Sequence, residues 1–310
     1  MYNAEIKMQY IQYCTENKNV RAEKFLPQLF SKTEAIEKQL NKDLSAFTFN
    51  EIMEMYQSLY STSFSSLMNI HSHLRDYANF CNLRNMLTDN INHYNEVDPA
   101  IIRKCLHEGL KKEQIVTRKE LLDLLKSDAI RNPYEKVWIL GVFEGIMGKA
   151  GGDLLHLRRG MIDFDNLIVH LPESGRELSI SKELALLIDT AINETVYVTA
   201  NGDKTRSFAK TDPDIVFKPS SNCRGTFATQ NAFRIMLLRY NQSLDLPYLN
   251  TFALKTSGTI DYIRELMRKD GCNDPVATYQ KHKSEVDVRY GSLTSFFHFE
   301  LYAEEYQRPL

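Results

Sequence analysis

The chain contains no apolar run near the roughly 20 residues that a membrane-spanning helix needs, and its first residues, MYNAEIKMQYIQYCTEN, lack the apolar core of a signal peptide. We therefore expect a cytoplasmic protein without a membrane partner. Cysteine is scarce as well: five residues are scattered along the chain and none forms a CxxC pair. This usage argues against a disulfide framework or a zinc ribbon and predicts reduced, mostly buried thiols.

The sequence also lacks the residue spacings that are typical of metal-binding and cofactor-binding sites. The histidines of the N-terminal part have no Cys or Asp partner at metal-ligand spacing: they are His71, His73, His93 and His107. The glycine-rich run GKAGG (residues 148–152) lacks the Lys-Ser/Thr ending of a phosphate-binding loop. We therefore predict neither a metal nor a cofactor.

The remaining composition is that of a soluble globular protein. The 310 residues suffice for two domains, with 43% hydrophobic and 25% charged residues. The net charge of −2 argues against a protein that coats nucleic acid non-specifically. It does not exclude a specific DNA binder, because the clustering of basic residues matters more than their sum.

Helix signals dominate the N-terminal part. N-cap patterns mark three helix starts: Thr48 with Glu51, Asp98 before Pro99, and Thr117 with Glu120. Apolar residues recur at helical spacing in SLMNIHSHLRDYANFC (residues 66–81), which predicts a bundle core. We predict a helical domain over residues 1–95, a linker within the polar stretch INHYNEVDP (91–99), and a second domain over residues 96–310.

The second domain is expected to combine helices with a small antiparallel sheet. YEKVWILGVFEGIMG (134–148) predicts a core helix, and LIVHL and ELSIS, joined by residues 172–176, predict a hairpin. DIVFK (214–218) is expected to add a strand, and helices are predicted near 226–243, 251–270 and from 274 onward. The fold class is thus mainly α with a small antiparallel sheet, that is, α+β.

The C-terminal segment SLTSFFHFELYAEEYQ predicts an aromatic helix with two possible roles. The simpler one is packing on its own domain, as large apolar side chains usually do. The other is an arm that docks on a second copy and makes a homodimer.

Three segments of the second domain form a pattern in this order: GKAGGDLL, FALK and YQKHKSEVDVRY. They resemble the boxes of the tyrosine recombinases of the phage-integrase family. The first box is GKAGGDLL, in which Ala150 stands where the family has arginine and Asp153 where it has glutamate. The second is FALK, in which Phe252 replaces histidine and Lys255 replaces arginine. The third is YQKHKSEVDVRY, in which Lys281 replaces glycine, His282 matches the family histidine, and Tyr290 falls one residue closer than the usual nucleophile.

The resemblance covers most of the chain, because the helical N-terminal part also looks like the family's core-binding domain. It implies two domains that close around duplex DNA. Within the family, the chain is most similar to the integrase-like repressors of SPbeta-type Bacillus phages. The hairpin of the family carries a catalytic lysine; this one has Arg176 at its turn instead.

The altered boxes predict that recombination chemistry is lost. Strand cleavage needs a tyrosine nucleophile and a phosphate held by two arginines and a histidine. Ala150 removes one guanidinium, Lys255 keeps a charge without the planar fork, and Phe252 supplies no donor. We therefore predict no catalytic residue and no enzyme; the degenerate positions are Ala150, Asp153, Phe252, Lys255, His282 and Tyr290.

DNA contacts do not depend on that chemistry, because much of the affinity comes from basic side chains on backbone phosphates. The predicted DNA-binding residues are Arg158, Arg159, Arg176, Lys204, Arg206, Lys255, Lys281, His282, Lys283 and Arg289. Lys210 lies in the same polar loop as Lys204. Each of these side chains could instead be a solvated surface charge. Tyr290, among the degenerate positions, could instead be a packing residue.

The sequence thus predicts a site-specific DNA-binding transcriptional repressor of phage lysogeny, associated with the nucleoid of a bacterial host. Duplex DNA is the expected partner, and a regulatory protein or peptide of unknown identity is compatible with this role. Two alternatives stay open. One is a divergent active recombinase that works through Tyr290, and the other is a protein-interaction module that has lost DNA binding, which the net charge of −2 permits.

Overall fold

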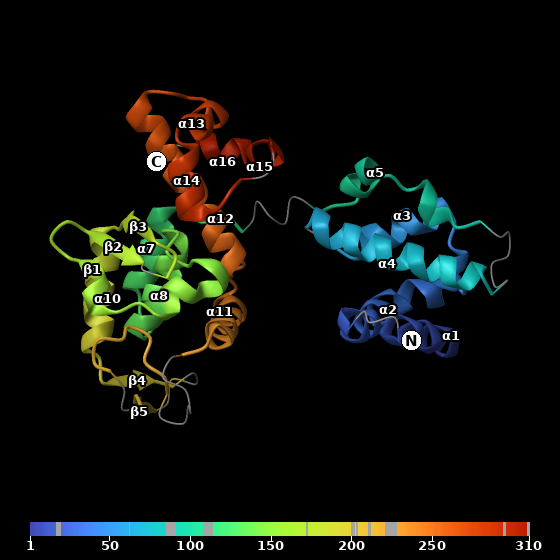
Figure 1. The fold of residues 1–310 in the computed structure, drawn as a ribbon, viewed down its shortest axis with the longest axis horizontal. Helices are drawn as coiled ribbons and strands as arrows, with labels where there is room; N and C mark the ends of the chain where they lie inside the picture. Colours follow the sequence, from blue (N-terminus) through green and yellow to red (C-terminus); the bar gives the residue numbers. More distant parts are fainter. Residues whose placement is uncertain are drawn as a thin grey trace. The chain divides into compact units, whose positions relative to one another are not determined.

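In a computed structural model the chain forms two compact units, unit 1 (Met1–Leu110) and unit 2 (Lys111–Leu310) (Figure 1). The structure describes residues 1–16, 20–61, 63–84, 91–107, 114–171, 173–199, 202, 204–209, 212–220, 228–293 and 296–308. Among the helices in these ranges, none is long and apolar enough to cross a membrane. The expected fold class, mainly α with small antiparallel sheets, is confirmed.

Unit 1 is a helical bundle, as its sequence predicts. Its helices are α1 (Ala4–Glu16), α2 (Val20–Leu40), α3 (Phe49–Ser58), α4 (Phe64–Asn82) and α5 (Pro99–Lys104), with the short 3₁₀ helices η1 (Leu44–Ala46) and η2 (His93–Glu96). The capping box before α3 is confirmed, because the backbone N–H of Thr48 donates to the Glu51 carboxylate over 2.8 Å. The carboxylate of Asp98 likewise caps α5 by accepting from the N–H of Ala100.

The stretch expected to be a linker is part of unit 1. Tyr94 in η2 is buried and donates its hydroxyl to the backbone oxygen of Leu44 over 3.0 Å. Ile102 of α5 is buried in the same core. The first unit therefore extends to Leu110 rather than to residue 95. Asn92 and Val97 of this stretch are buried together with Tyr94.

Unit 2 is built around a buried helix. Its helices are α7 (Arg118–Lys126), α8 (Pro133–Phe143), α9 (Gly152–Leu155), α10 (Lys182–Asn193), α11 (Gln230–Leu244), α12 (Thr251–Asp270), α13 (Pro275–Lys281), α14 (Lys283–Tyr290), α15 (Phe296–Leu301) and α16 (Ala303–Gln307), with 3₁₀ helices η3 (Lys149–Gly151) and η4 (Arg159–Met161). Every residue from Val137 to Phe143 of α8 is buried, and α10, α11 and α12 contact this helix. The apolar run of the sequence thus forms the core of the unit.

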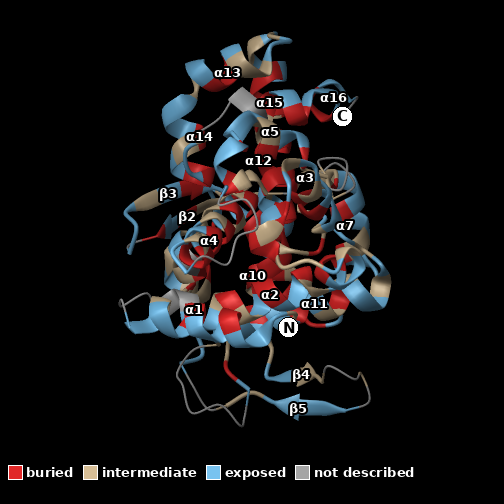
Figure 2. Ribbon diagram, turned by 90° about the vertical axis from the view of Figure 1, so that its right-hand side faces the viewer, coloured by how far each residue is buried: buried red, intermediate tan, exposed pale blue. Residues whose placement is uncertain are grey.

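Among its described residues, unit 2 also contains two small antiparallel sheets. The first has the order β1 (Ile162–Asp163), β2 (Ile168–Leu171) and β3 (Arg176–Ser179), and Leu171 pairs with Arg176 across the predicted hairpin. The second, β4 (Val196–Val198) with β5 (Thr205–Ser207), was not anticipated, and Figure 2 shows β5 as exposed.

The strand expected at residues 214–218 is wrong. Ile215 forms only an isolated bridge, with Arg158. Ile215, Val216 and Phe217 are all buried, so this apolar run is explained by insertion into the core rather than by a ladder.

The described aromatic residues of the C-terminal segment pack on their own unit. Phe299, Tyr302 and Tyr306 lie in one cluster with Ile260 and Ile263 of α12. This segment contains two short helices, where the sequence predicts one. The side chains of Phe296 and Phe297 lie outside the part of the chain that the structure describes.

Candidate phosphate-binding pocket

A cavity of about 340 Å³ in unit 2 brings the three sequence boxes together. Its wall includes Gly148 and Asp153 from the first box, Lys255 from the second and Tyr290 from the third, with Arg176 of β3 among them. The side chain of Ala150 lies outside the described part. Positions more than a hundred residues apart in the chain are therefore neighbours at one site.

Arg176 points into this cavity rather than away from the hairpin. Its Nη2 and Nε atoms lie 2.6 Å and 3.2 Å from Oδ2 of Asp153, a carboxylate whose side chain is 4% exposed. Arg176 follows the Gly175 turn as the first residue of β3. Arg176 thus follows the hairpin turn, as expected, and forms an inward ion pair in this structure. Its role as a DNA contact stays a prediction.

Tyr290 and Arg289 are buried at the end of α14. The Tyr290 hydroxyl donates to the backbone oxygen of Phe143, and burial raises the pKa of Tyr290 above its usual value. The Arg289 guanidinium donates to the backbone oxygens of Glu144 and Ser179 over 2.8 Å and 2.7 Å. Both side chains therefore have internal partners and a structural role in this conformation.

Lys255 is an exposed cation of the cavity wall, as is Lys149. Within the described ranges no acidic side chain pairs with Lys255, and burial of part of its stem, followed by the charge of Arg176, lowers the pKa of Lys255. A Cβ built on Gly291 would lie 3.7 Å from its Nζ, so the ammonium lies beside the chain that follows Tyr290. Phe252, one turn earlier on α12, is exposed to solvent.

The basic residues around the third box are paired with acids. Nζ of Lys281 and Nε2 of His282 each lie 2.8 Å from one oxygen of Asp270, and these bonds hold the pKa of that carboxyl below its usual range. Lys283 pairs with Asp287 one turn along α14. These cations remain predicted DNA contacts, although each would have to leave or share an acidic partner.

The other predicted DNA contacts are at the surface of unit 2. Arg158 pairs with Asp212, and Arg159 with Asp189 over 2.9 Å. Lys204 and Arg206 are exposed at β5, whereas Lys210 lies outside the described residues. The structure does not bring these four side chains into the cavity.

One surface that sequence reasoning missed lies on α11. Its inner face stacks Phe233 on Trp138, with ring centroids 4.1 Å apart and planes 7° from parallel. Its outer face exposes Arg234, Ile235 and Leu238. Among the long helices that the structure describes, α11 alone contains neither Asp nor Glu. The absence of Asp and Glu from this helix is the sequence signal that could have identified this surface.

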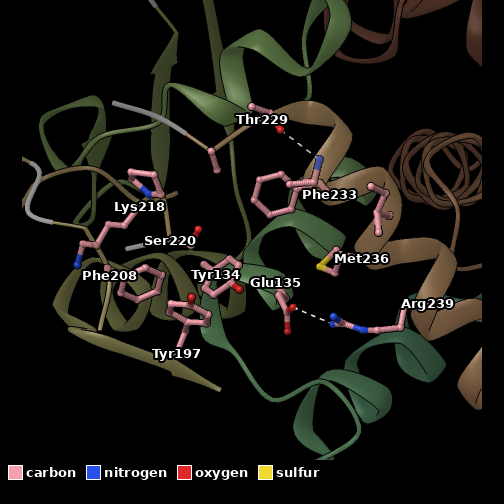
Figure 3. A pocket seen from close by; sticks show the side chains of 14 residues that line it. Tyr134, Glu135, Tyr197, Phe208, Lys218, Ser220, Thr229, Phe233, Met236 and Arg239 are labelled. Carbon is pink, nitrogen blue, oxygen red and sulfur yellow. Dashed lines mark hydrogen bonds and ion pairs between the residues drawn. The ribbon is translucent and has the colours of Figure 1, made fainter. Parts of the chain in front are cut away.

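A second cavity, of about 230 Å³, lies beside α11 (Figure 3). Its lining includes the aromatic side chains of Tyr134, Tyr197, Phe208 and Phe233. Its buried carboxylate, Glu135, accepts from Tyr240 Oη over 2.7 Å and from Arg239 Nη2 over 3.1 Å. Because this charge is satisfied within the protein, we assign the cavity no chemistry. In the described ranges no His, Cys, Asp and Glu side chains gather as a metal site.

Two family models match the chain. The MrpR C-terminal catalytic domain matches residues 115–277, and the MrpR N-terminal core-binding domain matches residues 1–83. The chain belongs to the MrpR family. The resemblance to tyrosine recombinases is thereby confirmed, as is the combination of a core-binding-type with a catalytic-type domain.

Other known proteins are similar over most of this MrpR-family chain. The SPbeta prophage-derived uncharacterized protein YopR of Bacillus subtilis (strain 168) is 23% identical over 291 residues, which cover 90% of this chain and 87% of YopR. A lambda integrase (75–356) dimer bound to a COC′ core site matches with 14% identity and a TM-score of 0.49, over 99% of this chain and 97% of that chain. The Tn1549 transposon integrase in complex with a circular intermediate DNA matches with 11% identity and a TM-score of 0.46, over 97% and 98%.

Proposed function

We propose that this protein binds duplex DNA at specific sites and represses transcription without cutting the strands. The observation that carries the proposal is the contrast between two residues of one cavity wall. Lys255 presents an ammonium that pairs with no acid in the described part, whereas Tyr290 donates its hydroxyl inward to Phe143. Such a cation attracts a backbone phosphate, and a hydroxyl so placed does not attack one.

The altered boxes support binding without chemistry. Ala150 stands where the related first box has arginine, and Lys255 offers a point charge where the second has a bidentate guanidinium. Loss of one stabilising donor in a phosphoryl or acyl centre costs about 10²–10³ in rate. Two such losses around a buried tyrosine favour an inactive site.

The chemistry of the outer face of α11 supports recognition of specific DNA bases. Arg234 offers a guanidinium that matches the acceptor pair of guanine, and the methyl groups of Ile235 and Leu238 suit the thymine methyl. A helix without carboxylates also approaches phosphates without like-charge repulsion. Lys255 then anchors the backbone, and α11 selects the bases.

The use we infer for such a protein is control of phage lysogeny in a bacterial host. Support comes from the relative YopR, which is described as prophage-derived. A homodimer and a regulatory partner that relieves repression are compatible with this role. A further candidate function is a protein-interaction module, favoured by the net charge of −2 and by the acid partners of Lys281 and Lys283.

Binding of the full chain to fragments of its source genome tests the proposal. Random duplex serves as competitor, and the salt concentration is varied. We expect retention of one or a few fragments, with an affinity that falls steeply with salt because phosphate contacts release counterions. Equal retention of all fragments and random duplex would reject sequence-specific binding and favour the protein-interaction module.

A further inference from the structure

The guanidinium of Arg176 joins segments from three parts of unit 2. Nη1 donates to the backbone oxygens of Gly145 (3.1 Å), Val288 (3.1 Å) and Arg289 (3.2 Å). Nη2 donates to the oxygen of Ile146 over 2.9 Å and also to Asp153. One side chain therefore connects the turn after α8, the carboxylate of α9 and the last turn of α14.

The backbone approaches the charged side chains of this network closely at two glycines. Gly145 has φ +81°, and a Cβ built there would lie 2.5 Å from Cγ of Arg289. A Cβ on Gly148 would lie 2.3 Å from Oδ2 of Asp153. Glycine at both positions lets the chain approach the two charged side chains, so the network is tightly packed and only 14% of the Arg176 side chain is exposed.

The contacts of Arg176 with α14 satisfy carbonyl groups at the C-terminal end of that helix. The last carbonyl groups of a helix have no partner within it, and its C-terminal end is favoured by a nearby positive charge. Val288 and Arg289 belong to the last turn of α14, directly before Tyr290. Arg176 satisfies their oxygens, and Arg289 ties the same turn to Glu144 and Ser179.

We propose that Arg176 is a positioning residue that holds the end of α14, and with it Tyr290, in the inward orientation. A guanidinium from the hairpin thus neutralises Asp153 although the first box has Ala150 in place of arginine. The inference goes beyond the proposed function, because it concerns the accessibility of Tyr290 and not DNA binding. If the proposed role of Arg176 fails its test, the proposed DNA binding is unaffected, and the reverse also holds.

The test is acetylation of tyrosine hydroxyls with N-acetylimidazole, located by peptide mass spectrometry. Full-length Arg176→Ala and Arg176→Lys variants are compared with the unchanged chain. We expect Tyr290 to react about tenfold faster in Arg176→Ala, because several charge-assisted hydrogen bonds are lost. Arg176→Lys should show a smaller increase, since one ammonium cannot reach all three segments.

Matched controls separate local release from unfolding. Exposed Tyr60 provides the reference rate, and buried Tyr302 reports the integrity of the C-terminal cluster. Arg206→Ala removes an exposed arginine of the same unit and should leave Tyr290 protected. Faster reaction of Tyr290 with Tyr302 still protected supports the proposal. Unchanged protection of Tyr290 in either folded Arg176 variant overturns it.

Hydrogen exchange of the unchanged chain covers the case in which both variants unfold. The N–H of Gly291 donates to the oxygen of Asp287 over 2.8 Å and so reports on the last turn of α14. We expect this amide and those of β3 to become exchangeable together as urea increases, because Arg176 joins the two elements. Opening of α14 at lower urea, with β3 still protected, overturns the proposal.

Discussion

The Tyr290 hydroxyl donates a hydrogen bond to the backbone oxygen of Phe143 over 2.9 Å. The two residues end α14 and α8, and only 3% of Tyr290 is exposed. The Tyr290 side chain therefore contributes to the packing of α14 against α8, although Tyr290 also lines the cavity.

This bond predicts that Tyr290→Phe affects stability and not DNA binding. Removing the hydroxyl leaves the Phe143 oxygen without that donor, at a cost of about 1–3 kcal/mol. Urea unfolding of the full chain measures the loss, and a gel-shift titration measures affinity. Weaker DNA binding with unchanged stability would mean that the hydroxyl contacts DNA.

Lys255→Ala is expected to weaken binding to all sequences alike. Loss of one phosphate contact should reduce the slope of log affinity against log salt by about 0.9. Lys281→Ala is the matched control, because Asp270 already pairs with that lysine and its loss should matter less. An unchanged slope in Lys255→Ala would remove Lys255 from the interface.

Arg234 is expected to contribute to sequence discrimination. Arg234→Ala should lower the preference for the bound site over random duplex by about 1–3 kcal/mol, the value of one bidentate base contact. Arg234→Lys keeps the charge and loses the fork, so it should retain non-specific affinity and lose discrimination. Equal discrimination in all three proteins would place α11 outside the base-reading surface.

In unit 1, Lys7 and Glu37 form an ion pair with both side chains fully buried, at 2.5 Å and 2.6 Å. Lys7→Met alone should cost about 3–5 kcal/mol, because a buried carboxyl loses its partner. The double variant Lys7→Met with Glu37→Leu should recover much of that stability. Urea unfolding of the unchanged chain, the single variant and the double variant measures the loss of stability. An equal loss in the single and double variants would contradict the expected cost of leaving the buried Glu37 carboxyl without a partner.

The same pair predicts a pH dependence. Burial raises the pKa of Glu37 from 4.5 to about 7, although Lys7 opposes the shift. The folded state then binds more protons than the unfolded state between these values, so this group's contribution to stability is complete below pH 4.5 and is lost as the pH rises through 7. Glu37→Gln should lack this component in urea unfolding measured across the window. An identical pH profile for the two proteins would assign the dependence to other groups.

Local sequence signals predicted the helices well. Thr48 with Glu51 and Asp98 before α5 act through neighbours two or three residues away, so these caps are specified locally. Gly271 ends α12 with φ +63°, as expected of a glycine stop. The stretch around Tyr94 was not predictable in this way, because its contact with Leu44 lies 50 residues away.

The sequence predicted part of the candidate site: Phe252 and His282 of the boxes do not line the cavity, whereas Lys149 does. The order of the boxes placed Asp153, Lys255 and Tyr290 together, as the cavity shows. The inward turn of Arg176 depends on oxygens more than a hundred residues along the chain, at Val288 and Arg289. No spacing in the sequence distinguishes such an arginine from one that faces solvent.

The central claim, specific binding without strand transfer, is tested most directly by footprinting the full chain on its selected duplex. Half of each sample is then denatured in detergent and examined for protein joined covalently to DNA. We predict a protected site at low salt and no detergent-resistant product. A detergent-resistant adduct that disappears in Tyr290→Phe, or the absence of any protected site, would contradict the account.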